Sequence, residues 1–318
     1  MGIPRLRIIQ DWALAIASIG CFGLLSGCGQ QKPPGLTVYA SQDQVYAEPL
    51  LRRFTERTRI PVQAIYDSEA VKTVGLANRL LAERDRPLAD VFWSNDEFRT
   101  RQLTAAGVFR ETNGWVAFGQ RSRQWVIHTQ ALVQAQISQI VPASLLELTN
   151  SHWRGKVAMA SPLFGSTATH FCVLRQRWGE ALWKQWCADL RRNELILTEG
   201  NSMVVRLVAR GQAVIGLTDS DDIAAGQREG WPVRGVSLGA DEWRMPNTVG
   251  IIRGSRRPAQ AQELMDYLRS AESLAFLEGA AALEPSTSSH ALQPAVDWEA
   301  LLSDLPTTTR LLRSIFLR

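Results

Sequence analysis

Residues 156–170 combine a short apolar run with a group of small hydroxyl side chains. Val157–Ala160 is suited to a buried strand, and after a break that contains proline and glycine, Ser166 or Thr167 can cap a helix. Unpaired backbone N–H groups at a helix N-terminus, with the hydroxyls of Ser166, Thr167 and Thr169, favour an anionic group such as phosphate, phosphonate or carboxylate. The alternative is a capped helix with no ligand.

A second polar cluster is acidic. Residues 213–218 form an apolar run typical of a strand, and Asp219, Asp221 and Asp222 follow it at once. Carboxylate oxygens bind hard cations such as Ca²⁺, Mg²⁺ or Mn²⁺, and they also pair with an ammonium group. This cluster therefore predicts a cation site, with Asp219 and Asp221 as the metal ligands.

The same residues allow an enzymatic interpretation. Ser166 and His170 are four residues apart and could meet on one helix face, where Asp219 or Asp222 would complete a Ser/His/Asp set. However, residues 164–168 do not form the Gly-x-Ser-x-Gly turn that usually presents such a serine. We therefore predict a binding protein with no catalytic residues, and keep a hydrolase as the alternative.

The elements that must position these residues alternate between strand-like and helical patterns. Apolar runs at 36–40, 60–66 and 89–93 alternate with helical patterns, which predicts an α/β fold with a parallel sheet and ligand chemistry at the strand C-termini. Two further runs, 115–118 and 124–129, are interpreted as strands divided by a basic turn.

Polar residues that follow these strands or begin the helices form the predicted ligand site. For any one of these residues alone, a role in a turn or a helix cap is an equally good explanation. The predicted ligand-binding residues are Ser41, Gln42, Asp43, Ser68, Asn95, Asp96, Ser166, Thr167, Thr169, Asp219, Asp221 and Asn247.

The N-terminus carries an export signal. Arg5 and Arg7 precede an apolar stretch over residues 12–25, and small residues lead from it to Cys28. The Leu-Ser-Gly-Cys ending resembles a bacterial lipobox, which implies cleavage after residue 27, lipidation of Cys28 and a tether over 28–35. An uncleaved anchor is the alternative, and both place the remaining chain outside the inner membrane.

The composition bears on the size of the folded core, on nucleic-acid binding and on the state of the cysteines. The 318 residues are 45% hydrophobic and 21% charged, which suits a large folded core in two lobes. The net charge of +4 is spread along the chain without a dense basic block, so nucleic acid is not an expected partner. Cys172 and Cys187 remain after the signal; they could form a disulfide in an exported compartment or stay as buried thiols.

Six segments together resemble the extracellular solute-binding proteins of bacterial ABC importers, in the ferric-iron and 2-aminoethylphosphonate-type group. They are residues 36–43, 60–66, 89–96, 153–170, 211–222 and 246–253, and residues 267–270 and 283–285 resemble the closing part of that family. The resemblance implies a bilobal, type II periplasmic-binding-protein fold with a hinge and an interlobe cleft. The chain would cross between lobes near 115–130 and 245–252, with lobe one over 36–116 and 250–318 and lobe two over 117–249.

This resemblance also implies a function. The chain would be a monomeric lipoprotein on the periplasmic side of the cell membrane, which passes a small ligand to an ABC permease and its ATPase. No cofactor is expected beyond a metal ion bound as ligand. The paired tyrosines with which ferric relatives bind iron are replaced here by residues 218–221, so that site is not carried over.

Two ligand hypotheses remain open. In the favoured one, an anionic end binds at 166–169 and a cationic end or bridging metal lies near Asp219 and Asp221. In the other, a cation or chelated iron binds to Asp219, Asp221, Asp96 and His170. A membrane-tethered sensor is the alternative to transport.

Overall fold

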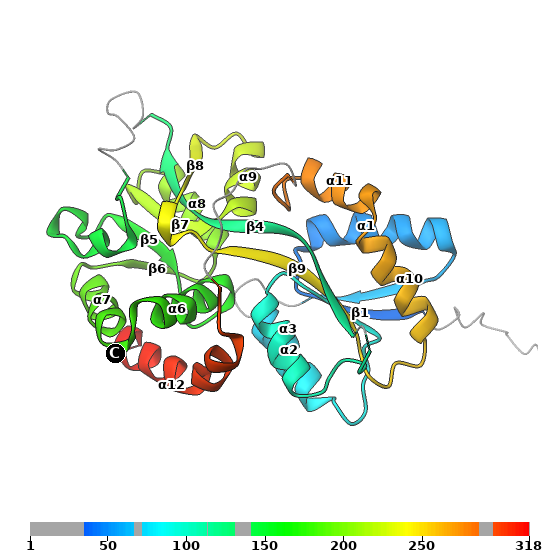
Figure 1. Ribbon diagram of the computed structural model, residues 1–318. Coiled ribbons are helices and arrows are strands. Elements are labelled where there is room, and N and C mark those ends of the chain that lie inside the picture. The colour runs from blue at the N-terminus through cyan, green and yellow to red at the C-terminus, as the bar shows by residue number, and fades with distance from the viewer. Residues whose placement is uncertain (1–34, 67–71, 113, 131–140, 286–294, 318) are drawn as a thin grey trace, which may run out of the picture. The chain divides into compact units, whose positions relative to one another are not determined.

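The computed structural model describes residues 35–66, 72–112, 114–130, 141–285 and 295–317 (Figure 1). The predicted signal, most of the tether with Cys28, and Ser68 lie outside the described residues. Within the described part of the chain, no helix has both the length and the apolar character needed to cross a membrane.

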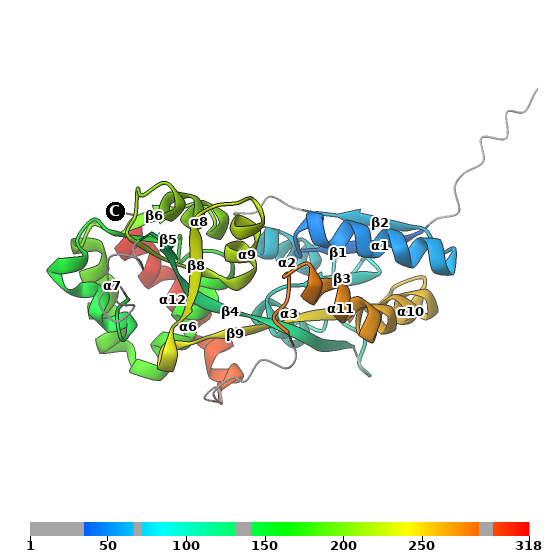
Figure 2. The same cartoon turned by 90° about the horizontal axis from the view of Figure 1, so that it is seen from above.

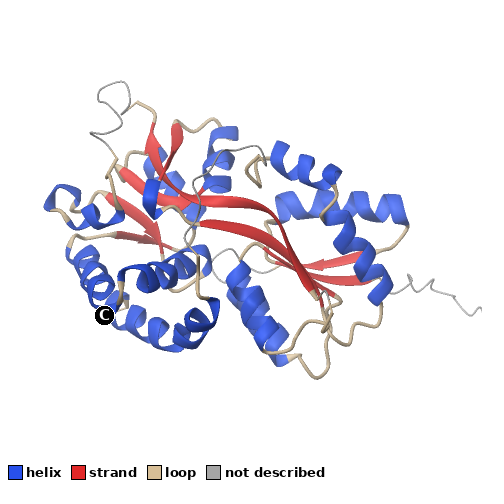
Figure 3. Cartoon of the chain, in the orientation of Figure 1, coloured by secondary structure: helices blue, strands red, loops and turns tan. Residues whose placement is uncertain are grey.

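One mixed sheet, with helices against its faces, organises the described residues (Figure 3). Its strands are β1 Leu36–Ala40, β2 Val62–Ile65, β3 Val91–Ser94, β4 Trp115–His128, β5 Val157–Ala160, β6 Ile196–Thr198, β7 Ile215–Asp219, β8 Val233–Ser237 and β9 Arg244–Ile251. The order is β2-β1-β3-β9-β4-β7-β5-β6, and β8 pairs with β4 off this path. The strands β1, β2 and β3 are parallel, as are β5, β6 and β7, which confirms the two predicted α/β units.

Helices follow the strands in both units. They are α1 Gln44–Thr58, α2 Lys72–Ala82, α3 Glu97–Ala105, α6 Gly165–Trp178, α7 Glu180–Arg192, α8 Asn201–Ala209, α9 Ser220–Arg228, α10 Pro258–Leu268, α11 Ala271–Gly279 and α12 Trp298–Phe316. Short 3-10 turns lie at Leu145–Thr149, Ser151–Trp153 and Gly239–Asp241.

Each half of the sheet has its own apolar cores. In the first half, β1 and β3 bury side chains such as Val38 and Trp93 against α1 and α10, with a second cluster around Phe92 on the opposite face. In the second half, Trp125 and Met159 pack with α6 and α7, and Val126 packs with α8 and α9. The separate cores fit the predicted two-lobed organisation.

The strands β4 and β9 run side by side and connect the two halves (Figures 1 and 2). The two predicted crossings, 115–130 and 245–252, fall on this pair of strands. The interpretation of 120–123 as a turn is wrong, because β4 continues through these residues and pairs with β9 on both sides of a bulge between Phe118 and Gln120. Gly119 supplies the left-handed conformation there, with φ +53°, and a Cβ atom would lie 2.3 Å from Leu283 Cδ1.

The C-terminal segment differs from the predicted boundary. The family resemblance predicts that 250–318 belongs to lobe one, but α12 packs beside α6 and α7 (Figure 1), and its Leu312 joins the core of the second half. Its buried residues Leu301, Thr308 and Leu312 recur at helical spacing along one face. Leu312 enters the core of the second half, whereas Leu301 packs in a separate cluster with Phe98 of α3.

Cys172 and Cys187 do not form a disulfide. Both thiols are free and buried, one in α6 and the other in α7. Of the two possibilities from the sequence, the structure therefore shows buried thiols.

Candidate functional site

A pocket of about 60 Å³ lies where the polar ends of both halves meet. Its walls come from the loop after β1, the loop after β3, strand β4, the start of α6, the loop before α8 and the turn from β7 into α9. Its lining residues are Asp43, Asn95, Arg121, Ala160, Ser161, Phe164, Gly165, Ser166, Thr167, Glu199, Gly200, Asn201, Asp219, Asp221 and Asp222. The carboxyl ends of the parallel strands thus converge on one polar cavity, as expected for an open α/β sheet.

The start of α6 forms one wall. The helix begins at Gly165, so Ser166 and Thr167 lie in its first turn, and the prediction that one of them is the N-cap is wrong. Gly165 has φ +57°, a conformation that glycine adopts without strain. The Thr167 hydroxyl is buried and has no hydrogen-bond partner among the described residues, which leaves it able to bind a ligand beside the helix N-terminus.

A buried polar network lies beneath this wall. Arg123 Nη1 lies 2.7 Å from Asp219 Oδ1 and donates to Asn201 Oδ1 at 3.0 Å. The Ser166 hydroxyl donates to Asp219 Oδ2 at 2.7 Å, and Asn201 Nδ2 donates to the same oxygen at 3.0 Å. Both carboxylate oxygens of Asp219 are therefore bonded within the protein.

Arg121 links this network to the first half of the molecule. One of its guanidinium nitrogens, Nη1, lies 3.2 Å from Asp221 Oδ2. The other, Nη2, lies 3.3 Å from Asp219 Oδ2 and donates to the backbone carbonyl of Asn95 at 3.2 Å. A single buried side chain of β4 thus contacts both walls of the pocket.

The charges in this network are mutually stabilising. Burial alone would raise the pKa of Asp219, but Arg121 and Arg123 lower it below its ordinary value. Burial opposes the charge on Arg121, yet Asp221 and Asp219 raise its pKa above the ordinary value. Both groups are therefore charged at neutral pH.

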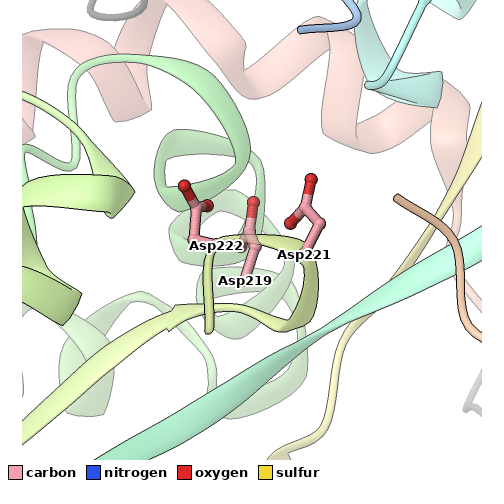
Figure 4. Close-up of side chains that lie close together, drawn as sticks. All are labelled: Asp219, Asp221 and Asp222. Atoms are coloured by element: carbon pink, nitrogen blue, oxygen red, sulfur yellow. The ribbon is translucent and has the colours of Figure 1, made fainter. Parts of the chain in front are cut away.

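Acidic side chains still outnumber arginines at the pocket. The carboxyl groups of Asp219, Asp221 and Asp222 point to one side of the turn between β7 and α9 (Figure 4), and one oxygen from each lies within 4.8 Å of the others. Asp43 and Glu199 add two further acids to the lining. This excess favours a ligand with positive charge on the acidic side of the pocket.

The structure brings together half of the predicted ligand-binding residues. Those that line the pocket are Asp43, Asn95, Ser166, Thr167, Asp219 and Asp221. Gln42 lines an adjoining chamber, and Ser41 donates to the side chain of Asn95 at 3.3 Å. Both residues therefore remain at the edge of the site.

The other predicted residues lie away from the lining. The Thr169 hydroxyl donates to Asp96 Oδ2 at 2.9 Å, and Asp96 Oδ1 accepts a bond from Phe98 N at the start of α3. Asn247 is buried in β9 and is not part of the pocket wall. Asp96 and Thr169 thus hold the two halves together.

Three residues of the site, Arg121, Arg123 and Asn201, are not among those predicted from the sequence. The two arginines lie on the same face of β4 as Trp125 and Ile127, because they alternate with them at strand period. Continuing the 124–129 strand back by two alternate positions would have placed both arginines on the buried face. Asn201 begins α8, directly after the polar closing segment of β6.

The hydrolase geometry is absent from the site. The Ser166 hydroxyl bonds with Asp219, whereas His170 Nε2 lies 3.2 Å from the Asp241 backbone carbonyl. His170 is not among the pocket-lining residues, so it does not serve Ser166 as a base.

Comparison with known proteins settles the family. Residues 36–280 match the sequence model of the bacterial extracellular solute-binding proteins. The chain belongs to this family. Its fold and family are those of proteins that bind solutes and do not catalyse reactions.

Individual relatives of this solute-binding protein are distant in sequence. A Haemophilus influenzae protein, described as uncharacterized, is 24% identical over 309 residues, which cover 88% of this chain and 84% of the relative. Iron-bound HitA from Pseudomonas aeruginosa has a TM-score of 0.75 at 17% identity, covering 89% of this chain and 100% of HitA. AfuA from Actinobacillus pleuropneumoniae, solved with fructose-6-phosphate, has a TM-score of 0.70 at 20% identity, covering 88% and 97%. These similarities confirm the predicted type II periplasmic-binding-protein fold.

Proposed function

We propose that this solute-binding protein captures a small ligand with an anionic end and a cationic end and passes it to an ABC permease and its ATPase. One observation carries the proposal: the buried Thr167 hydroxyl at the start of α6, which has no partner in the described part of the chain, shares a pocket with an excess of carboxylates. The helix start suits a phosphate, phosphonate or carboxylate, and the acids suit an ammonium group. AfuA was solved with fructose-6-phosphate, a sugar phosphate, and this supports an anionic end on the ligand.

A metal complex is the second candidate. The three clustered aspartates offer oxygen ligands for a hard cation, and HitA was solved with iron. However, Asp219 already uses both oxygens in the arginine network, so a metal here would rely on Asp221, Asp222 and neighbouring acids.

Calorimetric titration of the purified protein separates these candidates. The probes are 2-aminoethylphosphonate, inorganic phosphate and Mn²⁺. We expect the first to bind most tightly, and the variants Thr167→Val and Asp222→Asn each to weaken it by about tenfold, because each removes a polar contact worth about 1.4 kcal/mol. Thr307→Val and Asp85→Asn, at exposed positions, are the matched controls. Binding of Mn²⁺ alone, with no response to either organic or inorganic anion, would favour the metal complex.

We also propose that Cys28 anchors the protein by a lipid, and the lipobox-like ending supports this. Expression with radiolabelled palmitate should label the wild-type chain in the membrane fraction. The variant Cys28→Ser should lose the label, and it should either retain its uncleaved signal peptide or be released from the membrane. Label retained in that variant would contradict lipidation at Cys28.

A further inference from the structure

A second chamber of about 230 Å³ adjoins the candidate site. Asp43, Asp221 and Asp222 line both spaces and so form the boundary between them. The remaining lining residues of the second chamber are Ala40, Gln42, Gln44, Val45, Tyr46, Tyr66, Ser202 and Ala225.

The side chain of Gln42 is the unusual group in this chamber. It is 1% exposed, yet neither its Oε1 nor its Nε2 has a hydrogen-bond partner among the described residues. The hydroxyl of Tyr66 is also buried without a partner there, whereas the hydroxyl of Tyr46 accepts a bond from Arg228. A buried amide has two donors and an acceptor to satisfy, and leaving all of them unpaired is costly. Gln42 is therefore placed to bond with something that enters the chamber.

The chemistry of the chamber limits what can enter. Apolar groups of Ala40, Val45 and Ala225 and the Tyr46 ring form much of the wall, and neither lysine nor arginine is among its described lining residues. An anionic group would meet the three boundary aspartates, and Arg121, which pairs with Asp221, is shared with Asp219 and lines only the first pocket. A neutral group that both donates and accepts hydrogen bonds matches the Gln42 amide and the Tyr66 hydroxyl.

We infer that the ligand is an organic ammonium compound that extends into this chamber. Its cationic nitrogen lies at Asp43, Asp221 and Asp222, and a neutral carbonyl, amide or hydroxyl group beyond it pairs with Gln42 and Tyr66. Gln42 is thus a specificity-determining residue. This inference rests on the proposed function, because it extends the cationic end of the ligand proposed above.

Two amines of equal chain length test the inference. Butylammonium has no neutral polar group, whereas protonated 4-aminobutanamide carries an amide at its far end. Titration calorimetry of each is carried out with the wild type, Gln42→Leu and Asp222→Asn. Gln42 has no hydrogen bond to lose among the described residues, so Gln42→Leu should melt no lower than the wild type.

In the wild type, the affinity for 4-aminobutanamide should be at least about ten times that for butylammonium. Gln42→Leu should remove this preference by weakening the amide alone, while Asp222→Asn should weaken both amines. Equal binding of both amines to the wild type, or a preference that survives in Gln42→Leu, overturns the role of the chamber and leaves the proposed cationic site standing. If neither amine nor 2-aminoethylphosphonate binds, the proposed function itself fails.

Discussion

The aspartates that follow β7 differ in what each one does. Asp219 is 2% exposed and neutralises two buried arginines, whereas Asp222 is half-buried and faces the pocket. Removing one member of a buried ion pair leaves the other charge without compensation, which costs more than the pair itself contributes. Substitution of Asp219 should therefore reduce stability, whereas substitution of Asp222 should mainly affect ligand binding.

We expect Asp219→Asn to lower the free energy of unfolding by about 3–5 kcal/mol, because Arg121 and Arg123 lose their shared partner. Asp222→Asn should change it by less than about 1 kcal/mol. Urea unfolding of both variants measures the difference. Equal stability of the two would show that Asp219 is not the structural member of the cluster.

His170 makes stability depend on pH. Burial, then Arg123 and Arg177, lower its pKa well below 6.5, while the bond to the Asp241 carbonyl opposes this shift. Between the folded pKa and 6.5 the unfolded chain binds a proton that the native protein does not. Stability should thus fall as the pH drops below 6.5, by about 1.4 kcal/mol per pH unit down to the folded pKa.

The variant His170→Gln keeps a donor for the Asp241 carbonyl and cannot titrate. Its unfolding free energy should therefore lose less than that of the wild type when the pH is lowered from 7.5 to 5. Urea unfolding at both values provides the test, and identical losses would mean that other groups cause the acid sensitivity. Arg123, Arg177 and the Asp241 carbonyl, which act on the His170 ring, are present in both proteins.

At the scale of elements, β4 shows how tertiary contacts decide local structure. Its centre carries two arginines, and a basic segment of this kind predicts a turn. However, Asp219 and Asp221, about a hundred positions further along the chain, neutralise these arginines inside the sheet. The bulge at Gly119 then allows β4 to continue along β9. Neither feature is visible in a local pattern.

Gly119→Ala should lower the free energy of unfolding by about 2 kcal/mol, because alanine is strained at φ +53° and its Cβ would meet Leu283. The control is Gly279→Ala in α11, where no atom lies within 4 Å of the added Cβ. That variant should be neutral or slightly stabilising. A loss of stability in both variants would show that the bulge has no special requirement for glycine.

Much of the fold could be predicted because parallel strands are buried on both faces and appear as short apolar runs. The strands β1, β3, β5 and β7 and the polar groups after them were found in this way. The sequence does not predict helix α12, since Pro306 interrupts its pattern and the partners of its buried face, α3, α6 and α7, are distant in sequence. For the site, the acids and hydroxyls were predicted, but their arginine partners depend on contacts distant in sequence.

For the whole molecule, the bond from Thr169 in α6 to Asp96 before α3 joins the two halves directly. Proteins with this architecture close around ligands by hinge motion, so such a bond would favour the closed form. We expect Thr169→Val to have a larger radius of gyration than the wild type in ligand-free solution scattering. Thr308→Val is the control, since it removes a partly buried hydrogen bond that Arg175 donates within the second half only. Identical scattering of Thr169→Val and the wild type would contradict a role in closure.

The two buried thiols have a practical consequence. Burial raises the pKa of Cys172 to about 12 and also raises that of Cys187, so neither forms the reactive thiolate at neutral pH. Maleimide dyes and spin labels should therefore leave the folded domain unmodified. A single cysteine introduced on each half would then accept a probe selectively, and the opening and closing of the protein could be followed by energy transfer without first removing any native residue from the folded domain.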